Sequence, residues 1–252
     1  MRDNFQFITH KRPGIAACIF GCLAVSAVVI FSGFNFSGET AAKSIRTLIV
    51  GGGASHDFDR WYKQADTQML EKKDFATVTY TDHTDSIADY LPDIDVLYLA
   101  NNQPISDPEV RQAIFDFVES GKGLVLGHAA LWYNWEDWPD YNQQLVSGGS
   151  RSHNKYGNFN VEIVEKHPVT KGVKDFSLDD ELYHYELDAA GPGIEVLAEA
   201  STEEGGQSYP SIFVVKHPKG RIVGFALGHD AASHDLPQYQ QLLRNAIKWA
   251  AK

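Results

Sequence analysis

Short apolar runs alternate with amphipathic stretches through the first half of the chain. Residues 57–70 place Trp61, Ala65 and Met69 at four-residue spacing, which predicts a helix. The runs on either side are apolar or rich in β-branched and aromatic residues, as buried strands are. The predicted strands are residues 47–50, 76–81, 96–100 and 124–127.

A second helix is predicted to begin at residues 106–109, Ser-Asp-Pro-Glu. This segment supplies a capping side chain, an early proline and an acid near the helix amino terminus. Ile114, Phe115 and Val118 form its apolar face, and Gly121 is a typical stop. The alternation of strands and helices predicts an α/β fold with a parallel sheet and right-handed crossovers.

The second half of the chain has closely spaced strand candidates with short connections. This pattern predicts an antiparallel extension of the sheet, closed by a helix at residues 237–250 with a broad apolar side. The strand candidates are residues 159–164, 181–187, 195–200, 211–216 and 221–227.

The amino terminus carries an uncharged apolar segment at residues 14–34, preceded by Lys11 and Arg12. It is long enough to span a bilayer as an anchor, and it also fits a secretory signal cleaved near residues 40–42. Either alternative predicts export: a periplasmic or secreted protein, or one anchored in the inner membrane, with membrane contact only through residues 14–34. We therefore predict two parts, residues 1–42 and a single domain at 43–252.

Charge and cysteine content exclude several function classes. The net charge is −11 and residues 1–42 carry +1, so residues 43–252 carry −12. Such an acidic domain argues against nucleic-acid binding and favours neutral substrates or cations. Because Cys18 and Cys22 both lie in the apolar segment, the domain has no disulfide and no cysteine nucleophile, which excludes an amidotransferase.

Two histidines follow predicted strands in the same way, each after a glycine. His128 follows Gly127, and His229 follows Gly228 and precedes Asp230. Reacting groups collect at the carboxyl ends of strands in α/β proteins, and a carboxylate beside imidazole can fix its tautomer. We predict catalytic roles for His128, His229 and Asp230, with His128 and His229 as alternative metal ligands. The competing interpretation is a core histidine held by hydrogen bonds.

Further polar residues are candidates for substrate binding. His56 and Asp57 follow the first strand and its glycines, where the alternative is a plain turn with Asp57 capping the helix. His153 lies in a predicted loop of small polar residues and is either a ligand or exposed. Glu181 and Tyr183 belong to an acidic cluster, either a solvated turn or a source of a carboxylate for a sugar hydroxyl, a metal or a proton.

The aromatic run at residues 131–138 contains Trp132 and Trp135 among polar side chains. Aromatic faces stack on sugar rings, and the neighbouring Asn and Asp side chains can bind hydroxyls. This composition predicts a carbohydrate cleft. The alternative is aromatic packing over the edge of the sheet.

Several short motifs occur in a fixed order along the chain. They are Gly52-Gly53 with His56-Asp57, Gly127-His128-Ala129-Ala130, Trp138 with Tyr141, Gly149 with His153, His167-Pro168, Asp180-Glu181-Leu182-Tyr183, Gly220-Arg221, Leu227-Gly228-His229-Asp230 and Trp249. In this order and spacing they resemble the ThuA-like (trehalose utilisation) family over about residues 46–252. The match departs from the family pattern at residues 209–213, Tyr-Pro-Ser-Ile-Phe, where the family often has His-Pro followed by a Trp.

The resemblance implies a flavodoxin-like, class I glutamine amidotransferase-like three-layer sandwich, with the His128 turn in the place of the amidotransferase cysteine. It also implies a carbohydrate ligand such as trehalose or a 3-keto disaccharide. Two hypotheses follow. One is a sugar-modifying enzyme, of hydrolase or lyase type, that uses histidine acid/base chemistry or a divalent metal such as zinc. The other is a noncatalytic carbohydrate-binding or accessory protein.

Overall fold

The computed structural model describes residues 43–202 and 206–252. The predicted signal or anchor at residues 14–34 lies outside these residues. In the part of the chain that is described, the helices are too short or too polar to cross a membrane.

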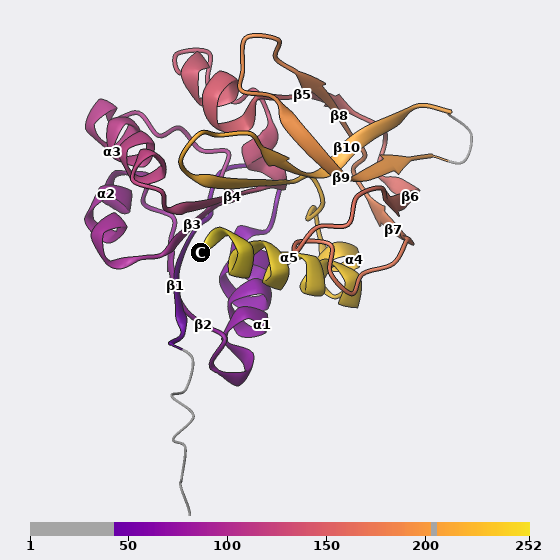
Figure 1. Cartoon of the computed structure of the whole chain (residues 1–252), viewed down its shortest axis with the longest axis horizontal. Helices are drawn as coiled ribbons and strands as arrows, with labels where there is room; N and C mark the ends of the chain where they lie inside the picture. Colours follow the sequence, from indigo (N-terminus) through magenta and orange to yellow (C-terminus); the bar gives the residue numbers. More distant parts are fainter. Residues whose placement is uncertain (1–42, 203–205) are drawn as a thin grey trace, which may run out of the picture. The chain divides into compact units, whose positions relative to one another are not determined.

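One nine-stranded sheet organises the domain (Figure 1). Its strand order is β2-β1-β3-β4-β11-β10-β9-β6-β7, parallel from β2 to β11 and antiparallel beyond. The parallel core with an antiparallel extension is therefore confirmed. The strands are β1 Ile45–Val50, β2 Ala76–Thr81, β3 Val96–Leu99, β4 Gly123–Gly127, β6 Gly157–Ile163, β7 Phe176–Asp180, β9 Ile194–Ser201, β10 Ser208–Val215 and β11 Arg221–Phe225.

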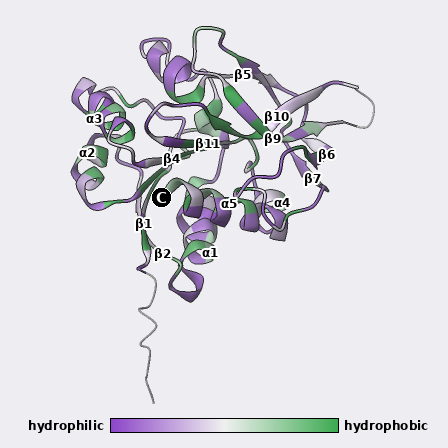
Figure 2. Cartoon of the chain, in the orientation of Figure 1, coloured by the Kyte–Doolittle hydropathy of each residue, from purple (hydrophilic) through white to green (hydrophobic). Residues whose placement is uncertain are grey.

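Helices cover both faces of the parallel part, because its strands are apolar on both sides. Ile49 of β1 packs on one face with the helical segment Asp59–Asp66, α1 (Thr67–Glu71) and α5 (Pro237–Ala250). Leu48 and Val50 pack on the other face with α2 (Ile87–Tyr90) and α3 (Pro108–Glu119). Figure 2 shows the resulting contrast between hydrophobic strands such as β1 and helices of mixed character. The three layers match the predicted sandwich.

Two strands differ from the sequence prediction. Residues 148–153, predicted as a loop, form β5 (Gly148–His153), which pairs antiparallel with β8 (Tyr183–Leu187) in a separate two-stranded sheet. The side chains of residues 148–153 are small or polar, so no hydrophobic pattern marks this segment as a strand. Its strand conformation comes from pairing with β8. The predicted strand 181–187 is shorter than expected, because residues 176–180 form the additional strand β7 and Glu181 lies in the connection to β8.

The strand directions gather the candidate residues at one edge of the sheet. The parallel strands β1, β3, β4 and β11 all end at this edge. Four antiparallel steps separate β11 from β7, so β7 also ends there. The segments that follow these strands carry His56, Asn102, His128, His229 and Glu181.

Candidate metal centre

His128 lies directly after β4, where the backbone turns sharply. Its φ is +33°, a region that non-glycine residues rarely occupy and that is concentrated at functional sites. The side chain is fully buried, and Nδ1 lies 2.7 Å from the Ala226 carbonyl. Because a carbonyl only accepts, Nδ1 carries a hydrogen, and in the neutral imidazole Nε2 is then bare. Nε2 faces the Glu181 carboxylate at 3.5 Å.

His56 reaches the same point from the loop after β1. Its Nδ1 donates to the Ala54 carbonyl at 3.1 Å, which again leaves Nε2 bare. The Asn102 amide fixes this loop by donating to the Ala54 carbonyl at 2.9 Å and accepting from the Ala54 amide at 2.8 Å. Gly53, with φ +128°, is required here, because a Cβ would collide with Asn102. Sequence reasoning missed Asn102, although its place just after β3 is a usable signal.

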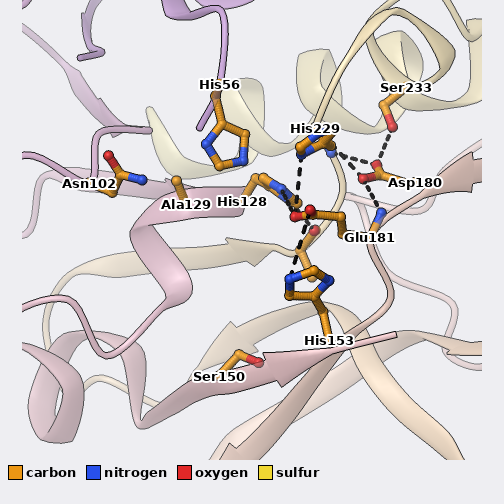
Figure 3. Close-up of polar contacts among 12 residues, drawn as sticks. His56, Asn102, His128, Ala129, Ser150, His153, Asp180, Glu181, His229 and Ser233 are labelled. Carbon is orange, nitrogen blue, oxygen red and sulfur yellow. Dashed lines mark hydrogen bonds and ion pairs between the residues drawn. The ribbon is translucent and has the colours of Figure 1, made fainter. Parts of the chain in front are cut away.

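His229 is presented by the turn after β11. Its Nδ1 lies 3.3 Å from Glu181 Oε2. The turn is fixed by Asp180, which accepts from the Gly228 amide at 2.8 Å, the His229 amide at 3.3 Å and the Ser233 hydroxyl (Figure 3). Asp180 is fully buried, so a solvated turn is the wrong interpretation of this acidic residue. Sequence reasoning did not assign Asp180 or Ser233 to the site.

Together these side chains form a cluster of four donor groups. One ligand atom from each of His56, His128, Glu181 and His229 lies within 4.8 Å of the other three. His56 Nε2, His128 Nε2 and His229 Nδ1 are buried and find no hydrogen-bond partner among the residues described. Zinc bonds of about 2.0–2.2 Å place tetrahedral ligand atoms about 3.4 Å apart. Small side-chain movements would thus bring all four groups around one ion.

The charges in the cluster favour a cation. Burial raises the pKa of Glu181, but its close contacts with the imidazoles of His128 and His229 outweigh burial and lower that pKa overall. The contact with the Glu181 carboxylate in turn raises the pKa of His229. Burial and the neighbouring His128 lower the pKa of His56 to about 4, so His56 is neutral near pH 7. A carboxylate surrounded by imidazoles is a donor set suited to a divalent metal.

Other predicted residues border this cluster. His153, at the end of β5, places Nε2 3.8 Å from Glu181 Oε1, while Nδ1 donates to the Asn154 carbonyl at 2.7 Å. Tyr183 stacks on His128 with ring centroids 4.3 Å apart. The Trp132 ring lies 5.8 Å from that of His153. The structure thus brings seven of the predicted residues together: His56, His128, Trp132, His153, Glu181, Tyr183 and His229.

Three predicted residues are placed otherwise. Trp135 is only 4% exposed and packs against Tyr141 at 4.5 Å between ring centroids, which is the alternative of aromatic packing. Asp57 is exposed and caps the following helix by accepting from the Arg60 amide at 3.0 Å. Asp230 caps α4 (Ala231–His234) by accepting from the Ala232 amide at 2.9 Å. We therefore withdraw Trp135 from the set of sugar contacts.

A cavity of about 250 Å³ opens beside the cluster. Its walls include His56, Glu181 and His153 together with Trp132, Asn102 and Asn134. A larger groove of about 1060 Å³ lies elsewhere, between the segment after β6 and α5. The larger groove is lined by none of the four donor groups, so the smaller cavity is the one that adjoins the cluster.

Comparisons with known proteins agree with this architecture. The family model described as "ThuA: Trehalose utilisation" matches residues 37–250. The search of curated proteins returned no match.

Solved structures show the same fold. A ThuA-like protein from Parabacteroides merdae has a TM-score of 0.73 and 22% identity, covering 83% of this chain and 91% of its own. A ThuA-like protein from Bacteroides uniformis has a TM-score of 0.70 and 20% identity, covering 85% of this chain and 95% of its own. The glutaminase domain of a Trypanosoma brucei CTPS has a TM-score of 0.51 and 10% identity, covering 81% and 94%.

Proposed function

The chain belongs to the ThuA family, which is linked to trehalose utilisation, and from this premise we propose that it is an enzyme acting on a sugar or glycoside at a divalent metal centre. The proposed ligands are His56, His128, Glu181 and His229. One observation carries the proposal: three buried imidazole nitrogens without partners among the described residues converge on one carboxylate. Buried polar atoms are normally paired, so such convergence indicates an absent partner that binds them all.

The donor set narrows the metal to zinc or a similar ion. Three imidazoles and one carboxylate suit borderline divalent cations better than Mg²⁺ or Ca²⁺, which prefer oxygen. Carbonyl groups orient His56 and His128 through Nδ1, the arrangement that keeps Nε2 free to bind metal. A cation held here would polarise the oxygens of a bound sugar.

The adjoining cavity supports a carbohydrate ligand. At about 250 Å³ it is smaller than the roughly 300–1,000 Å³ typical of sites for drug-sized ligands, which fits a single sugar ring. Trp132 offers an aromatic face, while Asn102 and Asn134 offer amides at the cavity wall. We infer that one ring of a disaccharide enters and the other projects outward.

We propose His153 as the base of the reaction. Its Nε2 lies 3.8 Å from Glu181 Oε1 and both residues line the cavity, yet His153 does not belong to the four-group cluster. With a 3-keto glycoside, the base removes the proton from the carbon between the ketone and the anomeric carbon. The released electron pair forms a carbon–carbon double bond as the anomeric carbon–oxygen bond breaks. The departing oxygen takes up a proton from the now protonated base, and the products are an unsaturated keto sugar and an alcohol.

A metal-free acid/base mechanism is the second candidate. Its support is the contact between His229 and Glu181, which raises the pKa of His229. A protonated His229 would then be the acid that donates a proton to the leaving group. In this mechanism the same residues act, but a metal ion is unnecessary.

Elemental analysis and a substrate screen test these alternatives. The tag-free full chain is expected to hold one divalent ion, and to lose both the ion and turnover of a 3-keto disaccharide after chelation. For histidine substitutions at the cluster, His83→Ala is the control, because the His83 side chain is exposed. Full activity without metal would support the acid/base candidate. Sugar binding without turnover of oxidised or unoxidised disaccharides would favour a noncatalytic carbohydrate-binding protein.

We further propose that the chain acts outside the cytoplasm. The support is the apolar segment at residues 14–34 with basic residues before it. Fractionation of cells that express the full chain would place it in the periplasm, the medium or the inner membrane. A cytoplasmic pool of full-length chain would overturn this proposal.

A further inference from the structure

The peptide unit before His229 is held from both sides. On one side, the Gly228 amide donates to Asp180 at 2.8 Å. On the other side, the Gly228 carbonyl accepts from the Tyr62 hydroxyl at 2.8 Å and from His234 Nε2 at 3.1 Å. Gly228 has φ +129°, and a Cβ there would lie 3.0 Å from the Tyr62 hydroxyl. Residues from two separate helical segments therefore hold the Gly228 carbonyl in place.

His234 is the less usual of these partners, because it belongs to a buried ion pair. Its Nδ1 lies 2.7 Å from Asp66 Oδ1, and both residues are 1% exposed. The Gly228 carbonyl and the Asp66 carboxylate are both acceptors, so both ring nitrogens of His234 carry hydrogen. Burial alone would lower the pKa of His234, but Asp66 raises it overall. Both contacts therefore favour the protonated form of His234.

Stability alone gives little reason for this pair. Well-packed apolar residues of similar volume often stabilise a fold as much as a buried ion pair does. Asp66 also accepts from the hydroxyls of Tyr98 at 3.3 Å and Tyr239 at 3.4 Å, so a whole polar network is buried beneath the Gly228 turn. What the network contributes that apolar side chains cannot is a directed pair of hydrogen bonds to one carbonyl.

We propose that Tyr62 and the Asp66–His234 pair are positioning residues for the metal centre: by fixing the Gly228 carbonyl they aim Nδ1 of His229 at the cluster. They touch neither the donor atoms nor the cavity, and they act through the backbone of residues 228–229. This inference rests on the proposed function, since it assigns His229 to a metal. Groups that orient a ligand in this way typically change metal affinity about 10–100-fold when removed.

Substitution of Tyr62 by phenylalanine gives the cleanest test. Tyr62→Phe removes one hydroxyl that donates to the Gly228 carbonyl. Tyr185→Phe is the matched control, because Tyr185 is also buried and donates to a carbonyl, that of Val146 at 2.9 Å, away from the cluster. His234→Gln removes the ion pair. Co²⁺ is the probe, and its affinity and visible absorption spectrum are measured on the full chain.

We expect Tyr62→Phe to weaken Co²⁺ binding about tenfold and to alter the spectrum, with a larger effect for His234→Gln. Tyr185→Phe should change neither measurement. If Tyr62→Phe and Tyr185→Phe bind Co²⁺ like the wild type, or lose affinity equally, the positioning role is wrong. If His234→Gln does not fold, the comparison of Tyr62→Phe with Tyr185→Phe still tests the positioning role.

The test also separates failure of this inference from failure of the proposed function. If the wild type binds no Co²⁺, the metal proposal fails, and hydrogen exchange at the His229 amide then decides the positioning role. Exchange should quicken in Tyr62→Phe but not in Tyr185→Phe. Equal exchange in the two variants would overturn the inference on its own.

Discussion

Glu181 Oε2 lies 3.3 Å from Nδ1 of His229, which joins the end of the antiparallel strand β7 to the turn after the parallel strand β11. Three strands separate β7 from β11 in the sheet. The contact depends on Asp180, which precedes Glu181 and binds the backbone amides of Gly228 and His229. One acidic residue therefore positions the turn, and the next one faces the imidazoles.

The proposed roles of His128 and His153 predict different defects. His128→Ala should lose the bound metal and turnover together, because it removes one of the four donor groups. His153→Ala should keep the metal and lower kcat by about 10²–10⁴-fold, the usual contribution of a general base. Metal content by elemental analysis and kcat with a 3-keto disaccharide are the two measurements.

The metal-free acid/base mechanism predicts no difference in metal content between the wild type and these variants. Metal content would then be the same, and near zero, in the wild type, His128→Ala and His153→Ala, although turnover falls in both variants. Equal loss of metal in His128→Ala and His153→Ala would instead place His153 among the ligands.

The tryptophans Trp132 and Trp135 should separate binding from stability. Trp132→Ala removes an aromatic wall of the cavity, so KM for the sugar should rise with little change in kcat. Trp135→Ala empties a core position, and the free energy of unfolding should fall by about 3–5 kcal/mol with KM unchanged. Steady-state kinetics and urea unfolding of both variants check this. A raised KM in Trp135→Ala alone would reverse the assignment.

Asp180 and its neighbour Asp179 form a matched pair for the role of the buried carboxylate. Asp180 accepts from several donors, whereas Asp179 is exposed and accepts from Asn158. Asp180→Asn leaves buried donors without partners and should lower the free energy of unfolding by about 3 kcal/mol. Asp179→Asn should change it by less than about 0.5 kcal/mol. Urea unfolding of both variants is the measurement, and equal effects would contradict this account.

The parallel half of the fold was accessible from sequence because its strands are buried on both faces. Leu48, Ile49 and Val50 are all fully buried, which gives a continuous apolar run. Strand β5 offers no such signal, since Gly148–His153 consists of glycines and polar residues. Its strand conformation comes from pairing with β8. Long-range pairing of this kind leaves no local periodicity in the sequence.

The same difference between parallel and antiparallel strands decides which site residues could be grouped from the sequence. His56, His128 and His229 follow parallel strands, and parallel strands place their carboxyl ends along one edge, so sequence order was enough to group them. Glu181 follows an antiparallel strand whose position depends on three intervening strands. Asp180 is hidden for another reason: its burial requires backbone donors from residues 228–229, which only the folded turn presents.

Acid sensitivity should arise at an ion pair remote from the site. Arg46 Nη2 lies 2.7 Å from Asp95 Oδ1, and the hydrogen bonds from Arg46 lower the pKa of Asp95 to about 2. Because the folded-state pKa lies below the ordinary value near 3.8, this pair stabilises the fold fully above that value and loses its contribution as pH falls through about 2. Partial exposure limits the effect to about 1 kcal/mol.

Asp95→Asn should lower the free energy of unfolding by this amount at pH 6 and by less at pH 2.5, as urea unfolding would measure. Asp85→Asn, at an exposed carboxylate, is the control, and the same pH dependence in both variants would show that Asp95 is not the source.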